Sequence, residues 1–310
     1  MNSQAPRILV IGSINMDLVV RSARLPRPGE TLTGVCLTEI PGGKGASQAV
    51  AAARLGGRIH MCGRLGCDGF GHALRRSLVE NDVDVRHVSD TERVSSGVAV
   101  IGVEDSGQNC ITVVPGANGC VTPADVAAVE SVLKDCRVLL LQLEIPQDAV
   151  LAAIRLAQQH QVLTILDPAP APDRLADGLL NVDVVCPNES EASAITGISV
   201  TDLPSAYAAA EALHKLGAAR VLITLGAQGA AYRDADGGIG HVPAPPVDVV
   251  DTTAAGDAFA AALGLALAEG RSFAEAVRFA CAAGSAAASK PGAQPGMPQR
   301  NTVDELLRRQ

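Results

Sequence analysis

Aromatic side chains are scarce in this sequence. Phe, Tyr and Trp together make up 2% of its 310 residues, and tryptophan is missing altogether. The chain therefore offers few rings on which nucleic-acid bases could stack. Positive charge is also in short supply, because the formal net charge is −8 and no long basic run interrupts the acidic balance. Both shortages argue against a nucleic-acid-binding protein.

Several motifs that would define a chemistry are missing too. The eight cysteines are scattered without a C-x-x-C pair, which leaves zinc ribbons and thioredoxin-like sites unsupported. The chain has no G-x-x-x-x-G-K-[ST] loop, and no G-x-G-x-x-G follows a predicted strand, which weakens a dinucleotide-binding interpretation. Cysteines in apolar runs such as "HMCGRLG" are typical of buried free thiols in a reducing compartment.

Signals for secretion and for membrane insertion are not found. The segment "MNSQAPRILVIGSI" has no basic region, no apolar core of signal length and no cleavage site. No uncharged apolar run reaches the roughly 18 residues that a membrane span requires. We therefore expect a cytoplasmic protein without a membrane partner.

Short apolar runs alternate with helical segments along most of the chain. Buried strands are predicted over 7–14, 137–145, 161–170, 182–188 and 219–226, and helices over 44–56, 123–136, 146–160 and 205–217. This alternation is typical of a parallel sheet that is covered on both faces. With 47% hydrophobic residues and no linker, the sequence predicts a single α/β domain over residues 1–310. Its architecture is a three-layer sandwich, with a mainly parallel central sheet flanked by helices.

Two regions depart from this rhythm. Residues 31–40 alternate apolar and polar side chains, as a strand with one wet face does. Residues 95–117 are predicted to form a hairpin that turns at 105–108. A small antiparallel β lid, formed by residues 16–40 and 95–115 and projecting from the main sheet, would accommodate both regions.

Polar residues stand where ligands of an open parallel sheet collect, at the carboxyl ends of the strands. They occur at strand ends and just before the last long helices: Asn15, Asp17, Glu144, Asn188, Glu191, Thr224, Gly226, and 251–257. Any one of them could serve as a turn or helix-capping residue. Their number in one chain favours a binding site.

Asp257 has two possible roles, because it directly precedes the apolar run "AFAAALGLALA". It could simply cap the helix and complement its dipole. Alternatively, the free N–H groups of Ala255, Gly256 and Asp257 could face a phosphate. A carboxylate at such a site makes sense if it takes a proton from a hydroxyl that attacks phosphorus. Asp257 is therefore the candidate base of a phosphoryl transfer.

Two segments of the sequence resemble those of a known protein family. "GGKGASQAVAAARLG" (42–56) and "VDTTAAGDAFAAAL" (250–263) resemble the signature segments of the PfkB family of carbohydrate kinases. The segments "GSINMDLVV", "LPRPGETLTG", "QLEIP", "PNESEASAITG", "VLITLGAQG" and "GAQPGMP" follow the family order, so the likeness runs from about residue 8 to 308. Within the family it is greatest to the kinases that transfer the ATP γ-phosphoryl group to O5 of D-ribose.

The resemblance implies roles for individual residues. Asp257 would be the general base, and the N–H groups of Ala254, Ala255 and Gly256 would form an anion hole. Residues at the sugar-binding positions are Asn15, Asp17, Gly42, Gly43, Lys44, Ser47 and Glu144. Residues at the ATP-binding positions are Asn188, Thr224, Gly226, Gly229, Gly256 and Cys281.

The resemblance also implies metal ions and a partner. Asn188 and Glu191 match the residues that organise Mg²⁺ through water. A loop that takes K⁺ in the family matches Asp251, Thr253, Ala287, Lys290, Gly292 and Gly296. The family's lid closes the sugar site and pairs two subunits, which implies a homodimer through the lid.

Three residues depart from the family pattern. Ser47 stands where an Asn is usual, so strict ribose specificity is in question. Cys281 replaces a His that is often found beside the adenine, which could relax the nucleotide preference. Gly296 stands where a Ser often helps to complete the cation site, which could weaken the K⁺ dependence.

Other functions stay open at this point. The same chemistry could act on deoxyribose, a nucleoside, a hexose or a keto acid. A non-catalytic sugar sensor on the same fold is disfavoured, because pure binding needs neither Asp257 nor the N-x-x-E pair. A nicotinamide-dependent oxidoreductase lacks its glycine fingerprint.

Overall fold

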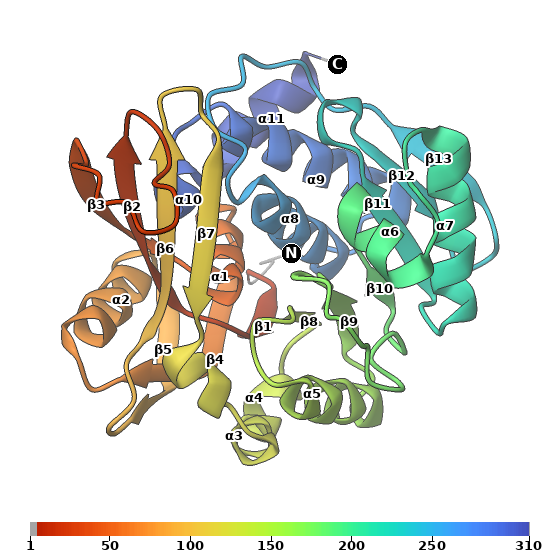
Figure 1. Cartoon of the computed structure of the whole chain (residues 1–310). Coiled ribbons are helices and arrows are strands. Elements are labelled where there is room, and N and C mark those ends of the chain that lie inside the picture. The colour runs from red at the N-terminus through yellow and green to blue at the C-terminus, as the bar shows by residue number, and fades with distance from the viewer. Residues whose placement is uncertain (1–4, 310) are drawn as a thin grey trace.

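The structure, a computed structural model that describes residues 5–309, contains a nine-stranded sheet and a four-stranded sheet (Figure 1). The nine strands follow the order β13-β12-β11-β10-β9-β8-β1-β4-β5. Their bounds are β1 Arg7–Ile11, β4 Arg58–Gly66, β5 Val83–Thr91, β8 Val138–Leu141, β9 Leu163–Leu166, β10 Val184–Val185, β11 Arg220–Thr224, β12 Ala230–Arg233 and β13 Ile239–Val242. All neighbours from β11 to β5 pair in parallel, and β12 and β13 add an antiparallel edge. The predicted mainly parallel sheet is confirmed.

Helices cover both faces of this sheet because its side chains alternate between two cores. Ile8 and Val10 of β1 point into one core, whereas Leu9 and Ile11 point into the other. The first core includes helices α1 Lys44–Arg54, α2 Gly69–Glu80, α8 Ala255–Ala268, α9 Phe273–Ala288 and α11 Arg300–Arg308. The second includes helices α3 Pro123–Ala128, α4 Glu130–Leu133, α5 Gln147–Gln159, α6 Glu189–Thr196 and α7 Leu203–Lys215. The result is the predicted three-layer sandwich.

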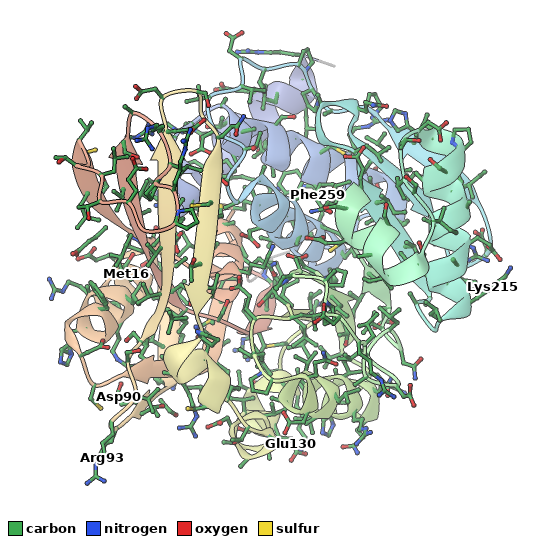
Figure 2. The ribbon with its side chains drawn as sticks, viewed as in Figure 1. Met16, Asp90, Arg93, Glu130, Lys215 and Phe259 are labelled. Carbon is green, nitrogen blue, oxygen red and sulfur yellow. The ribbon has the colours of Figure 1, made fainter. Side chains whose placement is uncertain are left out.

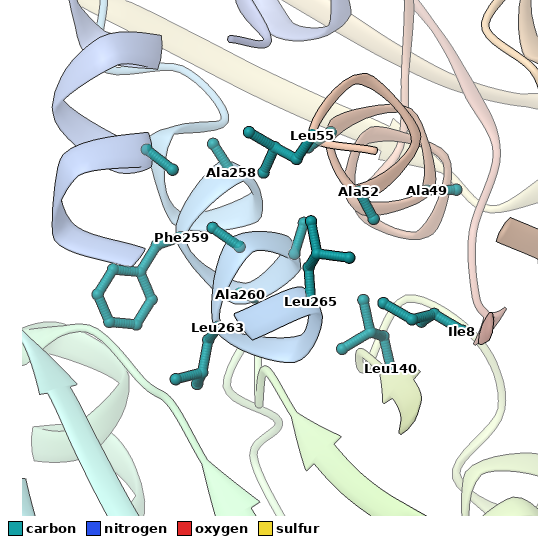
Figure 3. Close-up of a cluster of buried hydrophobic side chains, with 14 of the residues drawn as sticks. Ile8, Ala49, Ala52, Leu55, Leu140, Ala258, Phe259, Ala260, Leu263 and Leu265 are labelled. Atoms are coloured by element: carbon teal, nitrogen blue, oxygen red, sulfur yellow. The ribbon is translucent and has the colours of Figure 1, made fainter. Parts of the chain in front are cut away.

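Helix α8 lies at the centre of the first core. Eleven of its fourteen residues are buried, and it packs against α9, α1, β8 and β1. Figure 3 shows Leu263 and Leu265 of α8 in one apolar cluster with Leu55, the C-cap residue of α1, and Leu140 of β8. Burial on nearly every side explains why this helix is apolar all round. None of the helices between residues 5 and 309 is long and apolar enough to cross a membrane.

Charged side chains lie at the outside of the molecule. Figure 2 labels Asp90, Arg93, Glu130 and Lys215 at the periphery of the view, whereas Phe259 of α8 lies inside, where it is 5% exposed. The few charged groups that are buried are therefore informative, because an ionised group is costly to remove from water unless it is paired or needed.

The second sheet is the predicted lid. Its strands β2 Asn15–Ser22, β3 Cys36–Gly42, β6 Gly97–Glu104 and β7 Asn109–Val114 follow the order β3-β2-β6-β7. The outer pairs are antiparallel as predicted, but the middle pair β2–β6 is parallel. The reason is that β2 follows β1 and β6 follows β5, and these two strands of the main sheet run in the same direction. The hairpin turn at 105–108 is confirmed, since Gly107 N donates to Glu104 O.

Several predicted bounds were wrong. The strand predicted over 31–40 begins only at Cys36, and the helix predicted over 123–136 is interrupted at Val129, whose backbone (φ −100°, ψ 7°) leaves the helical conformation. The central strands are shorter than predicted: β1 is shorter at its carboxyl end, and β8, β9, β10 and β11 are shorter at both ends. No element was assigned to 58–91, where β4, α2 and β5 form.

Helix α1 starts in very close contact with the loop after β1. A Cβ added to Gly45 would lie 2.7 Å from the backbone carbon of Gly12 and from the nitrogen of Ser13. We expect Gly45→Ala to lower the free energy of unfolding by about 1–3 kcal/mol, because overpacking forces the helix to move. Denaturant unfolding would measure this change.

Gly69 provides the matched control, since it also lies in the first turn of a helix but an added Cβ would meet no atom within 4 Å. Gly69→Ala should be neutral or stabilising by up to about 1 kcal/mol. Equal effects of the two substitutions would contradict the close contact at Gly45.

Candidate active site

Asp257 is buried at the N-terminus of α8. It is 6% exposed, and its Oδ1 accepts a hydrogen bond of 3.1 Å from Nε2 of Gln48 and lies 3.9 Å from Nζ of Lys44. Burial raises the pKa of Asp257 to about 6; Lys44 and Gln48 oppose the shift, and the carboxylates of Glu144 and Glu191 add to it. A carboxyl group with a pKa near neutrality is suited to exchange a proton.

A second buried carboxylate, Asp167, faces the same two donors. Its Oδ2 accepts from Nζ of Lys44 (3.3 Å) and from Nε2 of Gln48 (3.1 Å). Burial raises the pKa of Asp167 to about 7, against the effect of Lys44. The sequence analysis missed Asp167, although it directly follows strand β9 and meets the criterion that identified Glu144.

Lys44 is the cation of this cluster. Burial alone would favour the neutral amine, but the pKa of Lys44 is raised because carboxylates surround it: Asp167, Asp257, Glu191 and Glu144, in decreasing order of effect. Lys44 therefore stays protonated, and the cluster keeps an excess of acidic groups. Such a site favours a ligand that brings positive charge with it.

The backbone before α8 takes an unusual conformation. Ala254, the N-cap residue, lies in the left-handed region with φ 59°, which is uncommon for a residue with a side chain. A Cβ added to Gly256 would meet no atom within 4 Å, so the space in front of this helix turn is open. The expectation of a free N–H at Ala255 was wrong for this structure, because that group donates to Thr252 O at 3.2 Å.

The residues expected to hold a sugar lie next to this cluster. Asn15 and Asp17 are at the start of β2, and Gly42 and Gly43 join β3 to α1. Gly42 lies against Asp17, since an added Cβ would be 2.2–2.6 Å from the Asp17 carboxylate. Burial, followed by Glu144 and Asp257, raises the pKa of Asp17 to about 7.

Hydrogen bonds made by two further residues, Glu144 and Asn118, hold this side of the site in place. Glu144 Oε2 accepts from Ser13 Oγ (2.5 Å) and from Lys44 N (3.2 Å), so it caps the first turn of α1 from another part of the chain. Asn118 Nδ2 donates to Asn15 Oδ1 (2.6 Å), and Asn118 Oδ1 accepts from Ile14 N (2.9 Å). Asn118 is buried in the short 3₁₀ helix η1 (Gly116–Cys120), and no strand-end or motif signal pointed to it. Ser47 lies on α1 and is 1% exposed.

The Asn188 and Glu191 pair is a helix cap. Asn188 Oδ1 accepts from Glu191 N, and Glu191 Oε2 accepts from Asn188 N, both at 2.9 Å, which is a capping box at the start of α6. This box uses only one carboxylate oxygen of Glu191, and the charge of Glu191 contributes to the pKa shifts of Lys44, Asp167 and Asp257. Glu191 therefore belongs to the same electrostatic cluster as the candidate base.

The expected nucleotide residues lie around strand β11. Thr224 forms an isolated β-bridge with Asn188, and Gly226 opens the 3₁₀ turn η2 (Gly226–Gln228). Gly229 and Cys281 both face the carbonyl oxygen of Val242: an added Cβ on Gly229 would be 2.0 Å from it, and the Cys281 thiol lies 3.8 Å away. Cys281 is only 4% exposed, so it lies within the packing of α9.

The residues expected at a cation are also close together. Asp251 accepts from Thr253 N (2.9 Å) and Gly292 N (2.8 Å). Backbone oxygens converge beside helix α10 (Ala293–Gly296), because a Cβ added to Gly296 would lie 3.5–3.7 Å from the carbonyl oxygens of Lys290, Pro291 and Ala287. In the part of the chain that the structure describes, no group of three or more His, Cys, Asp or Glu residues could hold a metal. The structure thus brings the sugar, base and Glu191 positions together, with the nucleotide and cation residues grouped beside them.

This fold and site define a class of protein. A family model for the pfkB family of carbohydrate kinases matches residues 5–300, and the chain belongs to that family.

Several proteins that are similar to this chain over nearly their whole length are ribokinases. The chain is 41% identical over 301 residues to the ribokinase of Bacillus subtilis and 38% identical over 301 residues to that of Haemophilus influenzae; these matches cover 97% of this chain and 99% and 98% of the relatives. The structure of Arabidopsis thaliana ribokinase complexed with ribose and ATP is similar with a TM-score of 0.90 and 34% identity, covering 98% of this chain and 99% of that one. Thermotoga maritima ribokinase gives a TM-score of 0.88 at 33% identity, with 97% and 99% coverage.

The raised pKa of Asp17 has a consequence for stability. The native carboxyl group keeps its proton up to pH about 7, whereas the pKa of an ordinary aspartate is 3.8. The native state therefore binds more protons in this window, and stability falls as pH rises through it. We expect Asp17→Asn to be more stable than the wild type at pH 8, by about 1–3 kcal/mol.

Urea unfolding between pH 4 and 8 would test this, and the difference should narrow toward pH 4. Asp84 provides a control of opposite sign, because its hydrogen bonds to Arg86 lower its pKa to about 2. Asp84→Asn should therefore not stabilise the protein at pH 8. A stability difference for Asp17→Asn that does not change with pH would contradict the shift.

Proposed function

We propose that the chain is an ATP-dependent kinase that transfers the γ-phosphoryl group of ATP to O5 of D-ribose. The observation that carries the proposal is the buried Asp257 carboxylate at the open N-terminus of α8, with a pKa of about 6. Support for the substrates comes from the relatives that are ribokinases and from a similar structure that holds ribose and ATP.

The chemistry follows from the placement of these groups. Asp257 accepts the proton of the O5 hydroxyl as O5 forms a bond to the γ-phosphorus and the bond from that phosphorus to the departing ADP oxygen breaks. Lys44 favours the ionised form of Asp257, which is the form that can accept a proton. The N-terminus of α8, with Gly256 in its first turn, stabilises the charge on the phosphoryl oxygens through its N–H groups and dipole.

The sugar-binding roles fit the chemistry of a pentose. Asn15, Asp17 and Glu144 present amide and carboxylate oxygens, which suit vicinal hydroxyl groups. Ser47 reaches less far than an Asn would, so 2-deoxyribose is the rival substrate of most interest. A sensor without catalysis gains nothing from a base held near neutral pKa, which favours the enzyme over the sensor.

Mg²⁺ fits the site as part of the Mg²⁺·ATP complex. Mg²⁺ usually keeps several waters and is bound through few carboxylates plus substrate phosphates. Glu191, whose capping box occupies only Oε2, and Asn188 would hold its waters. The ion would neutralise phosphate charge beside an acidic cluster.

K⁺ fits the loop around Asp251. The carbonyl oxygens of Ala287, Lys290 and Pro291 converge beside Gly296, and oxygen donors are what this ion requires. Asp251, Thr253 and Gly292 would complete the loop. Because Thr252 O accepts from Ala255 N, a cation here would order the first turn of α8.

We also propose a homodimer formed through the lid and a location in a reducing cytoplasm. The lid exposes large apolar side chains, including Leu37 (60%), Ile111 (56%) and Val114 (48%), which a second subunit would cover. The eight cysteines all lie within the described residues and are free, as expected in a reducing compartment.

The proposed reaction predicts a substrate preference and a base. In a coupled assay of ADP release, D-ribose should be turned over faster than 2-deoxyribose, hexoses and nucleosides. Asp257→Asn should lower kcat by at least about 10²-fold, the lower range for a positioned base, while ribose and ATP still bind in calorimetry.

Asp202→Asn is the matched control, because Asp202 is an exposed N-cap of α7 and Asn also caps well. It should leave kcat unchanged. Near-full turnover by Asp257→Asn would reject the base, and turnover of another compound in the panel but not of ribose would reject the substrate without rejecting the kinase.

The cation loop predicts a dependence on monovalent cations. Replacing K⁺ by tetramethylammonium should lower the wild-type kcat by about tenfold, less than the loss of an anion-hole donor costs. The Asp251→Ala variant should have a low kcat both in K⁺ and in tetramethylammonium. Asp248→Ala, an exposed position three residues earlier, should keep the K⁺ effect. Equal wild-type rates in both salts would reject a working site.

A further inference from the structure

Two buried glutamines connect the core of the protein to the candidate base. Gln48 of α1 is 1% exposed, and Gln142, directly after β8, is 0% exposed. Gln48 Nε2 donates to Asp257 Oδ1 and to Asp167 Oδ2, each at 3.1 Å. Gln142 Nε2 donates to Gln48 Oε1 at 2.6 Å. The three contacts form one chain from the sheet through α1 to α8.

The carboxylates dictate the orientation of both amides. Because Nε2 of Gln48 faces two acceptors, its Oε1 points away from them and needs a donor. Gln142 supplies that donor, and its own Oε1 is left without a hydrogen-bond partner among the described residues. An unpaired buried oxygen is unfavourable, and Leu or Met would fill this space without one. The donating end of Gln142 is therefore the feature that requires an amide here.

We propose that Gln142 and Gln48 are positioning residues that hold Asp257 through this amide relay. The relay fixes Asp257 Oδ1 and leaves Oδ2 to accept the proton of the attacking hydroxyl. Gln48 acts directly on the carboxylate, and Gln142 acts through Gln48. This inference rests on the proposed kinase function, because the proposed reaction needs a general base in a fixed orientation.

The charged surroundings determine what loss of the relay would do. The ionisable groups that face Asp257 come from five elements or their ends: Lys44 on α1, Glu144 after β8, Asp167 after β9, Glu191 on α6 and Asp17 on β2. Four of these five are acidic and favour protonation of Asp257. The hydrogen bond from Gln48 opposes them, so its removal raises the pKa of Asp257.

The test is a double-mutant cycle on turnover and its pH dependence. Gln48→Leu should lower kcat by about tenfold, because the Asp257 carboxylate is no longer held in its orientation. The KM for ATP should stay within about twofold of the wild type. The acidic limb of kcat/KM should move to higher pH, because Asp257 must be ionised to act. Gln142→Met should have a smaller effect in the same direction. In the double variant Gln142→Met should add nothing to Gln48→Leu, because it acts through that residue.

Gln294→Leu is the matched control, because Gln294 is also a buried glutamine (3% exposed) but hydrogen-bonds Gly42 and Ser77 and not the base. It should leave the acidic limb in place. Thermal unfolding of each variant would show whether it is folded. Additive effects of Gln48→Leu and Gln142→Met, or an unmoved acidic limb, would overturn the relay.

A readout without turnover separates this inference from the proposed function. Gln48→Leu should extend the loss of stability with rising pH to higher pH, since the native pKa of Asp257 rises. Absence of wild-type turnover on every compound of the panel would reject the kinase, and the unfolding profile would still decide the relay. An unchanged profile would overturn it.

Discussion

The burial of helix α8 is the packing interaction on which the rest of the site depends. Its apolar side chains fill the space between the sheet, α1 and α9, and this packing leaves the helix little freedom to shift or rotate. The only ionisable residue on the helix is Asp257, in the first turn. A helix that is packed on nearly every side presents that carboxylate, and the N–H groups beside it, at one defined point.

Fixing a carboxylate in this way has an electrostatic cost. Asp17, Asp167 and Asp257 all have raised pKa values, because each is buried near other acids, and Lys44 offsets the shift only in part at Asp167 and Asp257. Such groups oppose folding at neutral pH, and they are tolerated where function requires them. The same excess of negative charge disfavours the binding of free ATP, whereas the magnesium complex of ATP would bring compensating positive charge.

The sequence predicted those features of the site that depend on local pattern. Alternating apolar runs indicated the parallel sheet, and the rule that ligands meet strand ends identified Glu144 and Asp17. Asp167 satisfied the same rule but stands in "DPAP", which resembles a simple turn. Gln48 could not be found this way, because it lies 209 residues from Asp257 in the chain and only packing brings the two together.

The unassigned strands have a different explanation. Strand β4 carries His60 and Arg64 among its apolar residues, so neither strict alternation nor a continuous apolar run was visible. Arg64, for example, is accommodated by a salt bridge to Asp125, which lies 61 residues away in the chain. Such pairings are properties of the folded chain and leave no periodic signal.

The way the lid is attached has a mechanical consequence. Asn15 is in register with Gly42 on one side and Gly97 on the other, so the residues expected to meet the sugar form the first rung of the lid sheet. The far end, at the turn 105–108, lies about 25 Å away along eight residues of β6. The lid is therefore joined to the main body at the end where the sugar is expected. If a hydroxyl group binds Asn15 or Asp17 as proposed, a rotation of the lid about this first rung would move the turn at 105–108 farther than the rung itself.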